Sequence, residues 1–505
     1  MKKLLMLGIS LISTSYILAQ DINDALRYSM DEIQGTARFR AMGGAFGALG
    51  GDMSSVNINP AGSAIFNNSH ASVSLGIFNT NNDTNYFDSY NSDANTNVDL
   101  NQLGAAFVFK NTNTSSGWKK FSLSFAYDRT ADLDNDWVAS GVNPNNTIGS
   151  YFVTYANGLP LDDISALPGE SVSQAYSEIG SIFGFQNQQA FLGYEGYIIN
   201  PDEDETSDYY YSSIDGGNYN QRYAYASRGY NGKLAFNFAT SYDDKFYLGL
   251  NLNSHFIDYE QSTFLNESNS NASSTVSRVD FENNLLTTGS GFSFQLGGIA
   301  KITEEFRVGI SYNSPTWYRI SDETSQYLAT TRLENGSNIN QIVNPNVVNV
   351  YEEYKLKTPG KVTGSLAYVF GRQGLLSFDY AVKDYSTSKF KPTTDPVFSS
   401  LNTSISNDLD SAISYRLGGE YRYKQLSFRG GYRFEESPYK NDNFYGDLTG
   451  YSLGLGYNFG DLSLDFAFSQ SERDYNYQLY SEGLTDTAQI ESKLTDFILT
   501  LAFNL

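Results

Sequence analysis

Residues 451–469 read YSLGLGYNFGDLSLDFAFS and contain two runs in which every second residue is large and apolar. Tyr451, Leu453 and Leu455 alternate with serine and glycine, and after Gly460 and Asp461 a second run alternates leucine or phenylalanine with serine, aspartate or alanine. A period of two is the signature of a β-strand with one apolar face. The stretch therefore predicts two antiparallel strands joined by a tight turn.

The same alternation recurs along most of the chain and predicts fourteen strands. We place them at 70–78, 99–110, 120–131, 221–242, 246–265, 275–302, 306–319, 350–370, 375–390, 408–424, 426–437, 448–460, 462–478 and 487–505. Connections after most even-numbered strands are tight, whereas those after odd-numbered strands are long and polar, the largest being 132–220 and the next 320–349. A soluble β-sandwich would have short connections at both ends. The asymmetry instead predicts an all-β membrane protein: a 14-stranded antiparallel outer-membrane β-barrel with long extracellular loops and periplasmic termini.

Composition excludes several classes of function. The chain has 505 residues, no cysteine, two histidines, and 56 acidic against 33 basic residues, which gives a net charge of −23. Such a surface repels a phosphate backbone, so we expect no nucleic-acid partner. The absence of cysteine removes thiol nucleophiles and cysteine-ligated metals. Spacing places no serine or acid beside His70 or His255, and we predict no catalytic residues, no enzyme activity and no cofactor.

The chain divides into three segments. Lys2 and Lys3 precede an apolar stretch at residues 4–18, and cleavage before Gln20 predicts a signal peptide at 1–19. Residues 20–69 are expected to form a hatch that plugs the barrel, and residues 70–505 the barrel itself. No later run of 18 apolar residues exists. Because only closed barrels cross lipid without apolar helices, this agrees with the strand pattern.

The segment before the first strand is rich in glycine and alanine. Residues 21–36 are compatible with a short amphipathic helix, and residues 35–62 read GTARFRAMGGAFGALGGDMSSVNINPAG. The glycine spacing fits neither a dinucleotide loop nor a phosphate-binding loop. Small residues suit a closely packed element inside a lumen. Asn59, Pro60, Ala61 and Gly62 then have two interpretations: a gate that pins the hatch to the wall, or a simple helix or strand stop.

Charged residues are expected inside the barrel on two adjacent strands. If Leu417, Tyr421 and Phe428 face lipid, the alternation turns a set of charged residues into the lumen: Arg416, Glu420, Arg422, Arg429 and Arg433. Opposite charges on neighbouring strands form cross-strand networks. The network is compatible with a polar conduit and with a structural brace between wall and plug.

The largest loop contains apolar residues where the cell exterior is expected. These are Leu159, Leu161, Ile164, Leu167, Ile179, Ile182, Phe183, Phe185, Phe191 and Leu192. An exposed apolar patch marks binding, so the loop is a candidate substrate entry; the alternative is a small loop core packed on itself. Two acidic clusters, Asp132/Asp134/Asp136 and residues 202–205, lack the spaced ligands of a calcium loop. We expect solvated acids there and no metal.

Residues 35–62 resemble the N-terminal hatch of the FadL/TodX/OmpP1 outer-membrane transport family, in particular its long-looped, Bacteroidota-type branch. Residues 307–315 (RVGISYNSP), 431–438 (GYRFEESP) and 453–457 (LGLGY) are similar to strands of that family. The resemblance implies a fourteen-stranded barrel with a hatch. It also implies passive uptake of hydrophobic compounds, such as long-chain fatty acids or aromatic hydrocarbons, which leave sideways at a kinked strand. The family's Asn-Pro-Ala motif maps onto Asn59, Pro60 and Ala61.

Two functions remain open on this basis. The first is uptake of a small hydrophobic solute. The alternative is a barrel subunit of a larger secretion or assembly complex, acting through contacts with other outer-membrane or surface proteins. An open porin is disfavoured because a hatch should block ion flow. Either way we expect contact with outer-membrane lipid and, during biogenesis, with barrel-assembly machinery, which would recognise the apolar C-terminal strand ending at Leu505.

Overall fold

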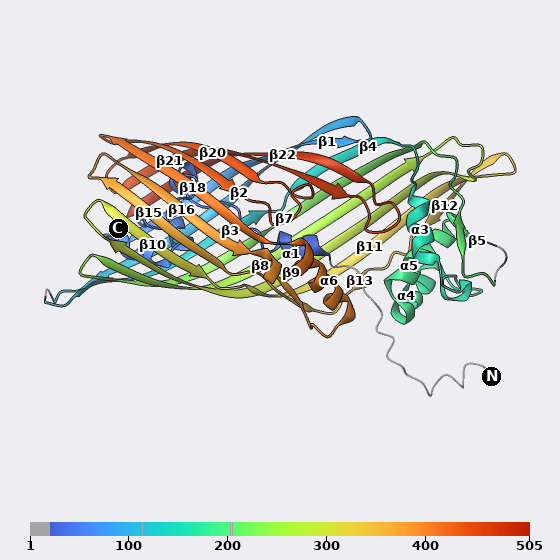
Figure 1. The fold of residues 1–505 in the computed structure, drawn as a ribbon, viewed down its shortest axis with the longest axis horizontal. Helices are drawn as coiled ribbons and strands as arrows, with labels where there is room; N and C mark the ends of the chain where they lie inside the picture. Colours follow the sequence, from blue (N-terminus) through green and yellow to red (C-terminus); the bar gives the residue numbers. More distant parts are fainter. Residues whose placement is uncertain (1–20, 114, 203, 205) are drawn as a thin grey trace.

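The computed structural model of the chain describes residues 21–113, 115–202, 204 and 206–505 (Figure 1). The expected signal peptide, 1–19, lies outside the described residues. Within the described part, none of the helices is both long and apolar enough to cross a membrane.

The chain forms a closed antiparallel barrel with fourteen strands around the wall, which confirms the predicted fold class. β1 (His70–Tyr86) pairs with both β2 (Ser89–Lys110) and the last strand, β22 (Thr487–Asn504), and this closes the ring. Between them the wall continues through β3 (Trp118–Asp132), β7 (Tyr219–Tyr242), β8 (Phe246–Ser268), β9 (Val276–Lys301), β10 (Phe306–Asn313), β15 (Lys361–Phe370), β16 (Gly374–Asp384), β18 (Ser411–Tyr423), β19 (Leu426–Glu435), β20 (Leu448–Asn458) and β21 (Leu462–Gln478).

Some wall positions contain two strands separated by a kink. β4 (Asn135–Asn143) continues β3, and β11 (Trp317–Glu334) continues β10 after Pro315. β14 (Tyr354–Lys357) precedes β15, with Pro359 between them, and it also pairs with β17 (Lys389–Lys391). A proline has no N–H for the ladder, which explains why two strands predicted as continuous, 306–319 and 350–370, are divided. β11 also pairs with two short strands, β12 (Ser337–Val343) and β13 (Asn349–Val350).

The two ends of the barrel differ as the sequence predicts. One end has tight turns, such as Asp243-Asp244, and holds the C-terminus, where Leu505 N donates to Ser69 O. The other end holds the long loops. The largest contains α3 (Ile148–Ala156), η3 (Leu161–Asp163), α4 (Val172–Phe183), α5 (Phe185–Glu195), β5 (Ile199–Pro201) and β6 (Tyr210–Ser212). These helices gather at that end in Figure 1. α6 (Pro396–Asp408), preceded by η4 (Tyr385–Thr387), lies in a second loop.

Side chains alternate between lipid and lumen as expected. On β20, Leu453 and Leu455 are 59% and 50% exposed, whereas Ser452 between them is 4% exposed. β1 and β2 are longer than predicted because their outer halves are rich in Asn, Asp and Thr and lack apolar alternation. They still pair up to a turn at Phe87 and Asp88, both with positive φ.

Candidate functional site: the hatch and the wall it closes

The N-terminal segment runs down inside the barrel from the long-loop end to the short-turn end. It contains α1 (Ile22–Arg27), α2 (Ala37–Ala41), η1 (Ser54–Asn57) and η2 (Pro60–Ile65). α1 begins with a capping box between Asp21 and Asp24, and its Ala25 and Leu26 pack into an apolar cluster with residues of β8, β11, β14, β17 and α6. Phe66, at the other end, accepts a hydrogen bond from Lys120 of β3. The first described residues thus lie within the barrel, near α6, rather than at the short-turn end.

The hatch contacts the wall backbone to backbone. A Cβ added to Gly431 of β19 would lie 2.2 Å from Gly43 N, and one added to Gly309 of β10 would lie 2.3 Å from Gly47 O. On β8, a Cβ at Gly249 would lie 2.2 Å from the carbonyl carbon of Pro60. Glycine on the wall strand permits this approach, and at Gly431 and Gly309 the hatch residue is also a glycine. Sequence reasoning identified the small residues of the hatch but missed the matching glycines on the lumen face of the wall.

Asn59 is a fully buried link between the hatch and two wall strands. Its Nδ2 donates to Gly47 O at 2.8 Å, to Gly298 O of β9 at 3.1 Å and to Ile310 O of β10 at 3.3 Å. Its Oδ1 accepts from Ala61 N at 3.1 Å, which caps η2, and Pro60 is the first residue of that helix. Asn59 therefore combines a helix start with a contact to the wall. Ala61 and Gly62 are buried beside it.

The predicted lumen charges divide into two groups. Glu420 binds Arg38 of the hatch at 2.9 Å, Arg429 at 2.7 Å and Arg422 at 2.5 Å. Arg429 also binds Asp465 of β21 at 2.5 Å. The hatch thus supplies one cation of this network. Arg38 and Asp465 were not predicted, because nothing in sequence spacing relates them to Glu420.

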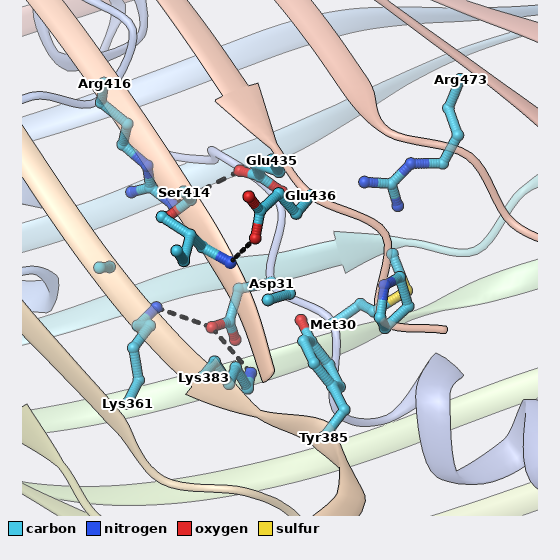
Figure 2. A pocket seen from close by; sticks show the side chains of 14 residues that line it. Met30, Asp31, Lys361, Lys383, Tyr385, Ser414, Arg416, Glu435, Glu436 and Arg473 are labelled. Carbon is cyan, nitrogen blue, oxygen red and sulfur yellow. Dashed lines mark hydrogen bonds and ion pairs between the residues drawn. The ribbon is translucent and has the colours of Figure 1, made fainter. Parts of the chain in front are cut away.

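Arg416 and Arg433 belong to the second group. Both face Glu435, at 3.6 and 4.0 Å. Arg416 and Glu435 border a cavity of about 40 Å³ inside the barrel, which also contacts Asp31 of the hatch (Figure 2). Asp31 binds Lys361 Nζ at 2.8 Å and Lys383 Nζ at 3.2 Å. The Asp31 side chain borders the cavity but lies inside the barrel, and this separation from bulk water disfavours its charged form. The two lysines outweigh that effect and hold the pKa of Asp31 well below the ordinary value.

The wall has an incomplete seam between β2 and the β3–β4 strand. β2 pairs with β3 only from Lys110 up to Gln102, which faces Asp128. Above this point the described backbones of β2 and β4 form no ladder, since β2 continues on β1 and β4 on β7. Side chains bridge the two edges instead. Val138 N donates to Asp93 at 3.0 Å, Asn95 donates to Asp136 at 2.6 Å and Asn97 donates to Asp134 at 2.6 Å.

The hatch occupies the lower end of this seam. Glu32 N donates to Thr130 O at 3.1 Å, and its carboxylate accepts from Asp132 N at 3.1 Å. From the other edge, Asn101 Nδ2 donates to Gly35 O at 2.5 Å. Thr130 is at a bulge of β3, where the pairing with β7 shifts register. Hatch residues 32–35 thus complete the wall where β2 and β3 separate.

The apolar residues of the largest loop do not form one exposed patch. Ile164 and Phe191 are fully buried in the core of the loop domain, as are Ile179 and Leu192, while Leu159, Leu161 and Phe185 pack against that core. Leu167, Ile182 and Phe183 are 50%, 54% and 40% exposed. Most of the predicted patch is therefore a loop core, and three residues remain on the surface.

The histidines and the acidic clusters have structural partners. His255 Nε2 lies 2.8 Å from Ser293 Oγ on the neighbouring strand β9. The expectation that no serine lies beside His255 was therefore wrong, because the β8–β9 register pairs Ser293 with Asn253, which is on the same face of β8 two residues from His255. His70 bonds Asn504. Arg129 binds Asp132, and Arg228 binds Asp136. Among the described residues, no group of three or more histidine or acidic side chains could hold a metal ion.

Fold and site together define a β-barrel of the outer membrane whose lumen is plugged by its own N-terminal segment. The chain belongs to the family described as outer membrane protein transport protein (OMPP1/FadL/TodX), whose model matches residues 206–502. This confirms the resemblance, although the matched residues do not include the hatch run 35–62.

Solved structures show the same fold at low sequence identity. A FadL homologue of Pseudomonas aeruginosa is 12% identical, with a TM-score of 0.54, over 94% of this chain and 99% of its own. The toluene transporter TodX of Pseudomonas putida is 13% identical, with a TM-score of 0.52, over 94% and 99% of the two chains. No curated protein matches the chain in sequence.

Proposed function

We propose that the chain is a passive uptake channel for small hydrophobic compounds, such as long-chain fatty acids or aromatic hydrocarbons. In this proposal the solute leaves the lumen sideways through the seam between β2 and the β3–β4 strand. Membership of a transport family supports the general role, and the similarity to a toluene transporter supports hydrophobic solutes.

The seam is the observation that carries the proposal. A wall held by backbone ladders cannot open locally without breaking many hydrogen bonds. This seam is closed by side-chain contacts instead, among them those of Asn95 and Asn97 and an ion pair between Arg129 of β3 and Asp99 of β2 at 2.7 Å. Its lower end is closed by the hatch. A movement of hatch residues 32–35 would therefore open the lumen and the wall together.

The direction of exit follows from the polarity of the two alternative routes. Below the seam, the lumen is filled by the hatch and by buried ion pairs such as Arg38–Glu420, which an apolar solute cannot hydrogen-bond. Beside the seam, Leu75 and Val98 are 53% and 71% exposed on the outer face of the barrel. An apolar solute gains roughly 25 cal/mol per Å² of surface removed from water when it moves into lipid.

A cross-link across the seam tests the route. The chain contains no cysteine, so Asn97→Cys with Asp134→Cys introduces one pair at side chains that already touch, next to Val98 at the edge of the apolar band. Oxidation of this pair should abolish uptake of a labelled long-chain fatty acid by cells, and a reductant should restore it. The control is Asp83→Cys with Ser92→Cys, which joins exposed residues of β1 and β2 where these strands are already paired.

If cells with the oxidised cross-link took up the fatty acid at the normal rate, lateral exit through this seam would be excluded. Absence of uptake of every apolar solute tested, in the wild type as well, would exclude the transport role. In that case purification in mild detergent should recover a stoichiometric complex, as expected of a barrel subunit of a larger machine.

A further inference from the structure

The cavity beside the hatch is lined by four basic side chains and three acidic ones. Four wall strands supply one cation each, namely Lys361 of β15, Lys383 of β16, Arg416 of β18 and Arg473 of β21. Figure 2 shows these side chains around the same space as Asp31, Glu435 and Glu436. Glu436 accepts a hydrogen bond from Ile413 N, so one of the three acids is already engaged by backbone.

Two of the arginines have no carboxylate within hydrogen-bond distance among the described residues. Arg473 is 6% exposed, lies 4.6 Å from the Tyr445 ring and hydrogen-bonds that tyrosine, while its Nε has no hydrogen-bond partner there. Arg416 is 8% exposed, its nearest ion-pair contact is Glu435 at 3.6 Å, and its Nε also lacks a partner. Glu435 is shared with Arg433 and its Oε1 accepts no hydrogen bond. Buried cations of this kind are costly unless an anion pairs with them.

Asp31 approaches the lysines from the cavity side. The side chains of Lys361 and Lys383 are 13% and 11% exposed, whereas 45% of the Asp31 side chain is accessible and borders the cavity. Lys383 also donates to Ser29 O, so the two lysines hold residues 29–31 of the hatch. A second anion bound in this cavity would contact the ammonium groups of Lys361 and Lys383, as Asp31 does.

We propose that Asp31 is an internal anion which a negatively charged group of a solute displaces, and that this exchange releases hatch residues 28–35. The proposal rests on the transport role and describes its regulation. Exchange leaves both lysines paired, so it avoids the cost of two unpaired buried cations. Because residues 32–35 also close the seam, release at Asp31 loosens the contacts of Glu32 and Gly35 with β3 and β2.

Chemical labelling of the hatch measures the release directly. Ser29 is 3% exposed and its hydroxyl has no partner among the residues that the structure describes, so Ser29→Cys is a mild change and gives the only cysteine of the chain. The rate of its reaction with a water-soluble maleimide is followed in lipid nanodiscs with octanoate, octan-1-ol or inorganic phosphate. Octanoate should raise the rate roughly tenfold, within the usual range of coupling between sites, and octan-1-ol should leave it unchanged.

Charge variants in the Ser29→Cys background identify the groups. Asp31→Asn should raise the rate without any anion. Lys361→Gln with Lys383→Gln should also raise it and remove the response to octanoate. Lys355→Gln with Lys389→Gln removes the same charge at exposed positions of β14 and β17 and should retain the octanoate response. Heat-dependent gel migration checks that every variant forms the barrel.

An equal effect of octanoate and octan-1-ol, or an unchanged rate in the lysine variant, would overturn the exchange. If phosphate also raises the labelling rate, the site binds free inorganic anions. If only octanoate raises it, the site requires an anionic amphiphile. The two proposals fail separately. Uptake without any labelling response excludes the exchange only, whereas a labelling response in a protein that takes up no apolar solute excludes the transport role only.

Discussion

Two adjacent glycines on β19 offer a test of how the hatch is seated. Gly431 faces the lumen, where a Cβ would lie 2.2 Å from Gly43 N and 2.4 Å from the carbonyl carbon of Met42. Gly430 faces the other way, and a Cβ there would meet nothing closer than 3.9 Å. We expect Gly431→Ala to weaken hatch docking by about 1–3 kcal/mol, the usual cost of overpacking, and Gly430→Ala to be tolerated.

The measurement is ion conductance in planar bilayers, together with heat-dependent gel migration for barrel formation. Gly431→Ala should conduct more than the wild type while the barrel still forms. If Gly430→Ala raised the conductance equally, close packing of the hatch against β19 could not be the cause.

The hatch segment around Glu32 should respond to pH. Burial and the nearby Asp132 raise the pKa of Glu32 to about 7, and burial and Asp21 raise the pKa of Asp24 to about 7. Both groups bind protons more strongly in the docked hatch than when released. Their contribution to docking is therefore fully present below the ordinary carboxyl pKa of about 4 and is lost as the pH rises through 7. Asp31 has the opposite sign, but its contribution is lost only in strong acid.

Conductance should consequently be higher at pH 8 than at pH 5. Glu32→Gln should reduce this difference, whereas Asp88→Asn, at the exposed β1–β2 turn, should leave it intact. A wild-type conductance that falls as the pH rises would show that neither carboxyl controls docking of the segment.

Elements in contact with lipid could be predicted from the sequence, and elements in contact with other parts of the protein could not. Leu453 and Leu455 alternate with small residues because one side of β20 faces lipid, so the strand is visible in the sequence. The outer half of β2 does not have one face in lipid, so its sequence shows no apolar alternation. Its seam with β4 depends on contacts between side chains that are far apart in the sequence, such as Asn95 and Asp136. The sequence draws attention to Asn59, but its partners are carbonyls of β9 and β10, which carry no residue-specific signal.

At the scale of the whole molecule, the apolar band around the barrel fixes its depth in the membrane. Outward apolar side chains cover β20 from Tyr451 to Tyr457, whereas the outward residues of β2 beyond Val98 include Thr96 and Ser92, which are polar and exposed. The band thus ends well before the tips of β1 and β2. We therefore place these tips, and the loop that contains α3–α5, beyond the membrane on the long-loop side; Figure 1 shows α3–α5 at that end of the barrel.

Arginine substitutions on the outer face locate this boundary. Leu455→Arg places a charge within the apolar band and should destabilise the barrel by about 2–4 kcal/mol, whereas Ser92→Arg, outside the band, should cost no more than about 1 kcal/mol. Both positions are exposed, so neither change disturbs the hatch or the lumen. Equilibrium unfolding in urea, with the protein in lipid vesicles, gives the two free energies. Similar losses at both positions would mean that the apolar band does not mark the membrane. The part of the seam beside Val98 could then not be placed at the level of the lipid.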